Sequence, residues 1–352
     1  QCKVLINDAT RENIWHIKFA RMFDMSNDSH LFYTYSQLVD KGAKLEGNKF
    51  LLNNQFYVPL YEGKMIWHYN HHFGTINEGT KEKPARQMAM PTSDELKNPN
   101  HNIMPWYWIP KEDMDNRLIK TDAKGNIIWE WSHKWLIGFR DITNATHDRT
   151  FVISLIPDAC GVGHSATLLF VERGTMPGAL LLGMMSSLVF DYATRQKIGG
   201  SHASISFVKQ FPVLTPEQVS SSGYEQDIVE RVARLCWFNH DLDGWMEELR
   251  EECPEEYDLP EEPVIWDEEQ RTVWQAELDA IFAHLYGLTT EDLRYILDPE
   301  DVCGKGCINE TFRVLKEREL RELGEYRTKR LVMEAWNKFE FDNKLKMLCY
   351  EK

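Results

Sequence analysis

The spacing of apolar positions changes near residue 216, and this change predicts two kinds of structure. Before that point, short apolar runs are interrupted by Asn, Gly and Pro, which is typical of strands joined by turns. After it, apolar residues recur three or four positions apart over long segments, which is typical of helices. We therefore expect an α+β protein, with a mixed α/β domain over residues 1–216 and a helical tail over residues 217–352.

The first domain divides again at about residue 135. The part before it is rich in aromatic residues, and its strand-like runs are KVLIN, KFLLN, FYVPLYEG and NIIWEWS. The segment KPARQMAMPTSDELKNPN lacks apolar periodicity, so we expect a long exposed loop there. From residue 136 to 216 strands alternate with a helix. The expected strands are RTFVISLIP and ATLLFV, the expected helix of about five turns is GALLLGMMSSLVFDYATRQK, and SISFVKQFPV closes the unit as a short extended segment.

Helical periodicity predicts the elements of the tail. The segments that show it are EQDIVERVARLCWFNHDLDGWMEELREEC, DEEQRTVWQAELDAIFAHLYGL, TFRVLKERELRELG and TKRLVMEAWNKF. An acidic, proline-containing connection, PEEYDLPEEPVIWD, lies between the first two. The tail is therefore expected to be a set of helices joined by polar connections.

Length and composition narrow the class of protein. A chain of 352 residues can bury a sizeable core without disulfide bonds, and its seven cysteines are odd in number and widely scattered. This cysteine usage fits a reducing cytoplasm, which is the expected location. The longest apolar stretch, GALLLGMMSSLV, is shorter than the roughly twenty residues that span a bilayer, so no membrane partner is expected. Because the sequence begins at Gln1, we expect a piece of a longer polypeptide.

Charge is concentrated in one part of the chain. The formal net charge is −15, and residues 241–300 hold 20 acidic against 3 basic residues, whereas residues 1–240 hold 25 of each. Nucleic-acid binding depends on the neutralisation of phosphates by Lys and Arg. The negative net charge therefore argues against nucleic-acid binding only for residues 241–300, which carry it. A segment of this kind is expected to be solvated, or to face away from a nucleic acid.

Two groups of residues partly match metal-ligand patterns. Cys303 and Cys307 form C-x3-C, but no second pair or nearby histidine completes four zinc ligands, so a glycine-rich turn is the better interpretation. His68, His71 and His72 lie in WHYNHHFG, which we interpret as strand-like. Neighbouring positions on a strand point to opposite faces, so at most two of the three could converge. We expect no metal in this chain.

Motifs for catalysis are sparse. The sequence contains no G-x-G-x-x-G, no Walker loop, no complete nucleophile elbow, and neither Asn-Pro-Pro-Tyr nor Asp-Pro-Pro-Tyr. We therefore assign no catalytic residue and expect no cofactor in this chain. One enzymatic alternative remains, because Glu62-Gly63-Lys64 is an E-x-K at the end of a predicted strand, as in Mg²⁺-dependent nucleases. In that pattern Glu62 and Lys64 form the second half, and Asp40 would supply the first carboxylate upstream.

Several stretches, taken together and in order, resemble one family. They resemble the C-terminal half of large adenine-specific DNA methyltransferases of bacterial restriction-modification and phage-defence systems. Nearly the whole chain is covered, which makes the resemblance more specific than any single motif. The stretches are MFDMSNDSHLFYT (22–34), PLYEGKMIWHYNHHFGT (59–75), GFRDITNATHDRTFVISLIP (138–157), FDYATRQKIGGSHASISFVKQFPV (190–213), QAELDAIFAHLYGLTTEDLRYILD (275–298) and GEYRTKRLVMEAW (324–336).

The resemblance implies a function and its partners. It implies a target-recognition region that binds double-stranded DNA and positions one adenine for flipping into a methyltransferase domain upstream in the same polypeptide. S-adenosylmethionine would bind that upstream domain, because its motifs are absent here. Other proteins of the defence system are further candidate partners. A protein-interaction module with an acidic helical tail remains an alternative.

Basic residues around a double glycine are the first candidate DNA contacts. In TRQKIGGSHASISFVKQF the glycines allow close backbone approach. Arg195, Lys197, His202 and Lys209 would then reach phosphates or base edges from one ledge. The alternative is an ordinary hairpin turn whose basic side chains are solvated.

Two further segments supply candidate DNA contacts. Arg140 and Arg149 bracket the Thr- and Asn-rich turn FRDITNATHDRT, and the alternative is that they pair with Asp141 and Asp148 within the turn. The loop KEKPARQMAMPTS (81–93) carries Arg86 and Gln87, which would become ordered on a duplex. The alternative for this loop is a disordered surface segment.

Overall fold

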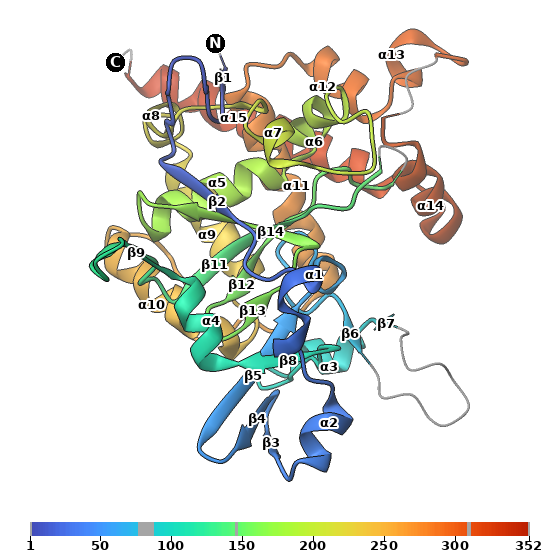
Figure 1. The fold of residues 1–352 in the computed structure, drawn as a ribbon. Coiled ribbons are helices and arrows are strands. Elements are labelled where there is room, and N and C mark those ends of the chain that lie inside the picture. Colours follow the sequence, from blue (N-terminus) through green and yellow to red (C-terminus); the bar gives the residue numbers. More distant parts are fainter. Residues whose placement is uncertain (1, 77–87, 145–146, 308–310, 351–352) are drawn as a thin grey trace.

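A computed structural model gives the structure of this chain, and it describes residues 2–76, 88–144, 147–307 and 311–350. Strands and helices are mixed along the first 216 residues, and helices occupy the rest (Figure 1). The fold is therefore α+β with a helical C-terminal region, which confirms the predicted fold class.

A four-stranded antiparallel sheet lies in the middle of the molecule, in the order β12-β11-β14-β2. Every residue of β12 and β14 is buried, and helix α5 packs against both strands. Strands covered on both faces have continuous apolar runs rather than alternation, which explains why these two strands were predicted correctly. The four strands are β2 (Ile17–Ala20), β11 (Trp135–Arg140), β12 (Ile153–Pro157) and β14 (Ala166–Val171).

A second sheet occupies the lower part of Figure 1 in the order β13-β5-β4-β3, with β8 also paired to β5. Its strands are β3 (Lys44–Glu46), β4 (Lys49–Leu52), β5 (Gln55–Tyr61), β8 (Trp108–Pro110) and β13 (Gly161–Val162). Three strand pairs lie outside both sheets: β1 (Lys3–Val4) with β15 (Pro212–Val213), β6 (Thr75–Ile76) with β7 (Met88–Ala89), and β9 (Ile119–Thr121) with β10 (Ile127–Glu130). Short helices of this part are α1 (Met25–Asp28), η1 (Ser29–Leu31), α2 (Tyr35–Asp40), η2 (Gly63–Met65), α3 (Ser93–Lys97) and α4 (Lys111–Arg117).

The long helix predicted after β14 is broken into two. Helix α5 (Thr175–Ser186) ends at Ser187, and α6 (Leu188–Arg195) begins there with a bend of 62°. Ser187 has an extended backbone, and its hydroxyl accepts a hydrogen bond from the Phe190 N–H, so it caps the second helix. Among the described residues no single helix is long and apolar enough to cross a membrane, and only this bent pair meets that criterion jointly.

Two segments differ from their predicted structure. Residues 204–213 were expected to be extended, but only β15 (Pro212–Val213) at their end is a strand, whereas α7 (Ile205–Val208) forms one helical turn that buries Val208. Polar and apolar residues alternate in this segment because one side of the helical turn packs on the core, and not because the segment is a strand. In the segment expected to be a long loop, the described residues include β7 and α3, whose N-terminus is closed by a capping box between Thr92 and Glu95.

The helical tail packs on the α/β part through one continuous core. Buried residues from Leu5 to Phe339 belong to the same hydrophobic cluster, and α11 packs against α5, α6, α9 and α15. The first predicted tail helix is divided at Asn239, whose side chain accepts the Asp241 N–H. The elements of the tail are α8 (Pro216–Ser220), α9 (Glu225–Cys236), η3 (His240–Leu242), α10 (Asp243–Glu252), α11 (Glu268–Leu285), α12 (Thr290–Leu297), α13 (Glu300–Cys303), α14 (Arg313–Leu323) and α15 (Arg327–Tyr350).

Candidate functional site

Two loops that the sequence analysis selected lie side by side in the structure. The turn after β11 and the bend after α6 exchange backbone hydrogen bonds: the Thr143 N–H donates to the Ser201 carbonyl at 2.9 Å, and the Ala203 N–H donates to the Asp141 carbonyl at 2.7 Å. Segments about sixty residues apart in the sequence thus form one surface. We call its exposed residues the paired-loop surface: Ile142, Asn144, His147, Lys197, Gly199, Gly200, Ser201 and His202.

A buried carboxylate fixes the first of these loops from inside. Asp191 of α6 is fully buried, and it accepts hydrogen bonds from the backbone N–H of Thr150 at 2.9 Å and of Phe151 at 2.7 Å. The Nε atoms of Arg195 and Arg149 lie 3.2 Å and 3.6 Å from its Oδ2. Burial of a charge is costly unless it is paired and hydrogen-bonded, so these arginines are required by Asp191.

Arg195 is therefore an internal brace, which corrects the expectation that it would reach DNA. Its guanidinium donates to the carbonyls of His147 at 2.6 Å and Asp148 at 2.7 Å, and also to the carbonyl of Thr311. It lies 4.9 Å from the centre of the Phe312 ring, and the side chain is only 7% exposed. The physical reason is that a guanidinium presents its five N–H donors in a rigid planar arrangement. Here the buried Asp191 carboxylate and the carbonyl groups accept hydrogen bonds from it.

Arg140 and Arg149 are internal as well. Arg140 donates to the carbonyls of Gly63 at 2.8 Å and Ile66 at 2.6 Å, and burial lowers the pKa of Arg140 to about 10. Arg149 donates to the carbonyl of Ser186 at 2.5 Å and is 13% exposed on its side chain. Neither side chain forms the phosphate ledge that was expected from the sequence.

The alternative expected for these two arginines, pairing with Asp141 and Asp148, differs from the structure too. Asp141 Oδ2 lies 3.0 Å from His202 Nδ1, and Asp148 pairs with Arg318 of α14. Both acidic residues therefore link the first loop to its neighbours. The first loop is held by contacts to α6, to the second loop and to α14.

Two predicted basic residues remain accessible on the paired-loop surface. Lys197 is exposed, and no described residue forms an ion pair with it. His202 is 59% exposed despite its contact with Asp141. Lys209, in contrast, pairs with Asp8 at 2.9 Å and so does not belong to this surface. The remaining candidates, Arg86 and Gln87, lie outside the described residues.

The residues of the nuclease alternative form a local pair. Lys64 Nζ lies 3.0 Å from Glu62 Oε2, with both side chains partly exposed. The Gly63 N–H between them donates to the Ser165 hydroxyl at 2.9 Å, which fixes this turn against β14. The lysine that would steady an attacking water is thus paired with its own candidate metal ligand. The nuclease alternative remains a prediction that only an activity assay can test.

A cleft of about 790 Å³ adjoins the first loop. It lies between the segment 67–73, which we call the histidine turn, and helices α11, α14 and α15. Trp67 and Phe73 stack on its wall with ring centroids 5.1 Å apart. Burial raises the pKa of Asp279 to about 7, and its carboxyl group accepts the Leu188 N–H at 2.7 Å. Charged residues of both signs line the cleft: Asp148, Arg149, Glu268, Arg271, Asp279, Arg318, Glu319, Glu322 and Arg327.

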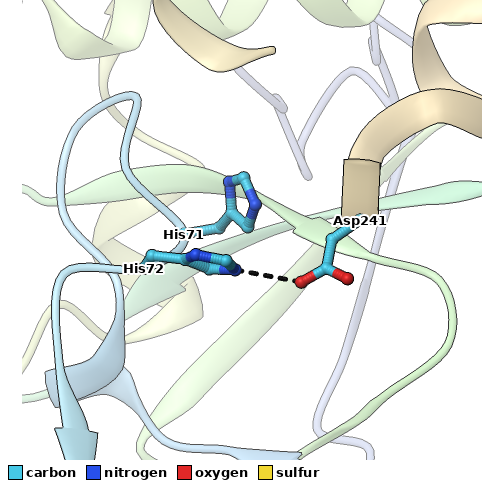
Figure 2. A group of neighbouring side chains, drawn as sticks. All are labelled: His71, His72 and Asp241. Atoms are coloured by element: carbon cyan, nitrogen blue, oxygen red, sulfur yellow. Dashed lines mark hydrogen bonds and ion pairs between the residues drawn. The ribbon is translucent and has the colours of Figure 1, made fainter. Parts of the chain in front are cut away.

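The histidine turn also brings His71 and His72 against Asp241 (Figure 2). His72 Nε2 donates to Asp241 Oδ2 at 2.9 Å, and the two histidine rings lie 4.4 Å apart. The expected alternation of neighbouring side chains fails because this segment is a turn and not a strand, with Tyr69 at a φ of 56°. As the sequence analysis allowed, two of the three histidines converge, and His68 is not part of this group; both His68 and His72 line the cleft.

The acidic partners in these clusters, Asp191 and Asp241, were not among the residues predicted from the sequence. Asp241 is separated from His72 by 169 positions, so no local pattern could connect them. Asp191 is different, because it precedes Arg195 by four positions on a predicted helix, and that spacing indicates an ion pair. This spacing indicated a partner for Arg195, but not the burial of the pair, because i,i+4 ion pairs also form on exposed helix surfaces.

No protein-family model matches the chain, and no curated protein matches it. Two kinds of observation bear on the function of this chain. One is the resemblance carried by six segments of the sequence, and the other is the geometry of the paired-loop surface, the cleft and the histidine cluster.

Proposed function

We propose that this chain is the DNA target-recognition module of a site-specific adenine DNA methyltransferase of a restriction-modification or phage-defence system, acting in the cytoplasm beside a methyltransferase domain of the same polypeptide. The pairing of two of the resembling segments, 138–157 and 190–213, carries this proposal. The groups that contact phosphates and those that contact base edges must lie on one face of the protein, and the paired-loop surface brings polar groups from two segments onto such a face.

The chemistry of the paired-loop surface suits a duplex. Lys197 provides a point charge for a phosphate, and Ser201 and His202 provide donors and acceptors for base edges. A Cβ atom added to Gly199 or Gly200 would meet no atom within 4 Å, so the bend is open to solvent. Backbone without side chains can approach a ligand closely. The surface therefore combines an exposed lysine, which forms no ion pair with any residue that the structure describes, with an accessible backbone.

The acidic part of the chain does not oppose this arrangement. Helix α10, which lies in the acidic segment, is on the opposite side of Figure 1 from α14, the helix that Asp148 of the first loop contacts. Some acidic side chains of the segment are also paired within the fold, such as Asp258 with Arg234 at 2.5 Å and Glu277 with Arg231 at 2.8 Å. The acidic side chains of α10 therefore lie away from the paired loops, whereas Glu268 and Asp279 of the same segment line the cleft beside the first loop.

The test is duplex binding by the full chain at several salt concentrations. Affinity should fall steeply with salt, because each phosphate contact contributes a slope of about 0.9 in log K against log salt. Lys197→Ala should weaken binding about equally for all duplex sequences and reduce that slope by about one contact. The matched control is Lys124→Ala, which removes an exposed lysine from the turn between β9 and β10, away from the paired loops.

Two results would refute the proposal. One is absence of duplex binding even at about 50 mM salt, where phosphate contacts are strongest. The other is equal affinity of Lys197→Ala and Lys124→Ala at every salt concentration. A change of base specificity in His202→Ala, with an unchanged salt slope, would support direct readout by this surface.

A further inference from the structure

We infer that His71, His72 and Asp241 form a binding site for one divalent transition-metal ion, with Zn²⁺ as the best match, between the histidine turn and η3. One ligand atom from each residue lies within 4.8 Å of the others, the one such group among the residues that the structure describes. Figure 2 shows the two imidazole rings side by side, with the carboxylate beside them. The site is independent of the proposed DNA recognition.

The donor set is of the kind that binds zinc. Two imidazole nitrogens and one carboxylate oxygen, with water in the fourth position, are established ligands of this ion. His72 Nε2 and Asp241 Oδ2 are already 2.9 Å apart, so both can turn toward one ion with small movements. A metal ion would take the place of the proton in this hydrogen bond, and His72 would remain a neutral ligand with its proton on Nδ1.

An unpartnered nitrogen at the same place is a second, independent indication. His71 is 1% exposed, and its Nε2 has no hydrogen-bond partner. A buried polar atom without a partner costs free energy, so such atoms are uncommon and call for a reason. The hydrogen bond between His72 and Asp241 explains the positions of those two residues alone. A bound ion would explain all three.

The structure also supplies an approach path for the ion and its water. The side chain of Asp241 is 25% exposed, whereas His72 is fully buried, so the ion would enter from the carboxylate side. On that side lies a cavity of about 320 Å³ whose lining includes Asp241, Tyr61 and Cys160. The Tyr61 hydroxyl is buried without a hydrogen-bond partner, so it is available to a metal-bound water.

The positive charge of the neighbouring Arg271 makes the negative charge of Asp241 necessary for metal binding. Arg271 is buried close to the cluster, where it donates to the carbonyls of Leu235 and Tyr69 and stacks 3.7 Å from the centre of the Trp266 ring. Its charge opposes a second cation nearby. The negative charge of Asp241 is therefore needed for a divalent ion to remain. Replacing Asp241 by its neutral isostere should abolish binding while changing the shape of the site very little.

The experiment titrates the metal-free full chain with Zn²⁺ by calorimetry and with Co²⁺ by visible absorption. We expect one equivalent of each ion, a Co²⁺ spectrum without thiolate bands, and an unfolding temperature that rises with Zn²⁺. His71→Ala and Asp241→Asn should lower the affinity by at least about 100-fold, since loss of even a residue that only supports a ligand costs 10–100-fold. His68→Gln, which changes a buried histidine of the same turn, should retain the affinity.

Circular dichroism and the melting temperature of metal-free Asp241→Asn show that this variant is folded, so its loss of binding is interpretable. Three outcomes would overturn the inference. They are no binding by the unaltered chain at about 100 μM ion, where even a weak site would be filled, unchanged affinity in Asp241→Asn, and binding that disappears in Cys303→Ser. The last outcome would place the ion at the C-x3-C turn instead.

Discussion

Replacing Arg195 with alanine tests whether this residue stabilises the fold from inside or contacts DNA. In the folded chain, Arg195 pairs with the fully buried Asp191 at 3.2 Å and donates to the carbonyls of His147 and Asp148. Alanine leaves the Asp191 carboxylate with two backbone amides and Arg149 at 3.6 Å. Removing one partner of a buried ion pair costs about 3–5 kcal/mol, because the other charge stays buried.

That cost converts into a measurable change in melting temperature. Unfolding entropy is about 2.1 cal/mol/K per residue, which gives about 0.74 kcal/mol/K for 352 residues, so 1 kcal/mol shifts the midpoint by about 1.4 °C. We expect Arg195→Ala to melt about 4–7 °C lower than the unaltered chain. Lys197→Ala, two residues along the chain, removes an exposed side chain and should change stability by less than about 0.5 kcal/mol.

Scanning calorimetry and duplex binding together decide between the two roles. A brace predicts that Arg195→Ala loses stability, whereas Lys197→Ala loses affinity for DNA and keeps its melting temperature. Arg195→Lys should recover little of the lost stability, since an ammonium group cannot reproduce the fork of donors. The reasoning is refuted if Arg195→Ala melts normally and binds duplex more weakly, because Arg195 would then be a surface contact.

Further predictions concern other residues of the same region. Because burial raises the pKa of Asp279 to about 7, the folded chain keeps a proton there that the unfolded chain loses near pH 4, and this group lowers stability as the pH rises from about 4 to about 7. The free energy of unfolding of Asp279→Asn at pH 8 should therefore exceed that of the unaltered chain by at most about 4 kcal/mol, whereas the two should be similar at pH 4. Urea titrations measure both values, and equal unfolding curves at pH 8 would contradict this prediction. Gly63→Ala should lower the stability of the fold by about 1–3 kcal/mol, because the added Cβ would collide with the Ser165 carbonyl. Gly199→Ala should lower it by less than about 0.5 kcal/mol, and a comparison of the two melting temperatures checks the difference. The chain should leave plasmid DNA uncut in the presence of Mg²⁺; cleavage that disappears in Glu62→Ala would establish the nuclease alternative instead.

Much of the fold follows from local patterns in the sequence. The buried strands β12 and β14 are continuous apolar runs, and α11 has apolar residues at helical spacing, so their types were predicted correctly. The break between α5 and α6 was not predicted, because apolar residues lie on both sides of Ser186 and Ser187. The contact of the Ser187 side chain with the Phe190 N–H caps the second helix at this point. The turn of α7 was missed for a similar reason, since its polar alternation also fits a strand.

Some features of the candidate sites could be identified from the sequence alone. The sequence by itself selected the two loops of the paired-loop surface, because glycines, polar residues and basic residues are concentrated there. It also determined the fold class, because apolar spacing depends only on neighbouring positions.

Only the tertiary structure decided which basic side chains are free. Arg140, Arg149 and Arg195 look like surface cations in the sequence, yet each donates to carbonyl groups from distant parts of the chain. The Lys197 side chain, in contrast, is exposed and forms no such bond with any residue that the structure describes. The same applies to His72 and Asp241, which meet across 169 positions. A charged group binds the acceptors that surround it after folding, and which acceptors those are is set by packing between remote segments rather than by the residues beside it in the sequence.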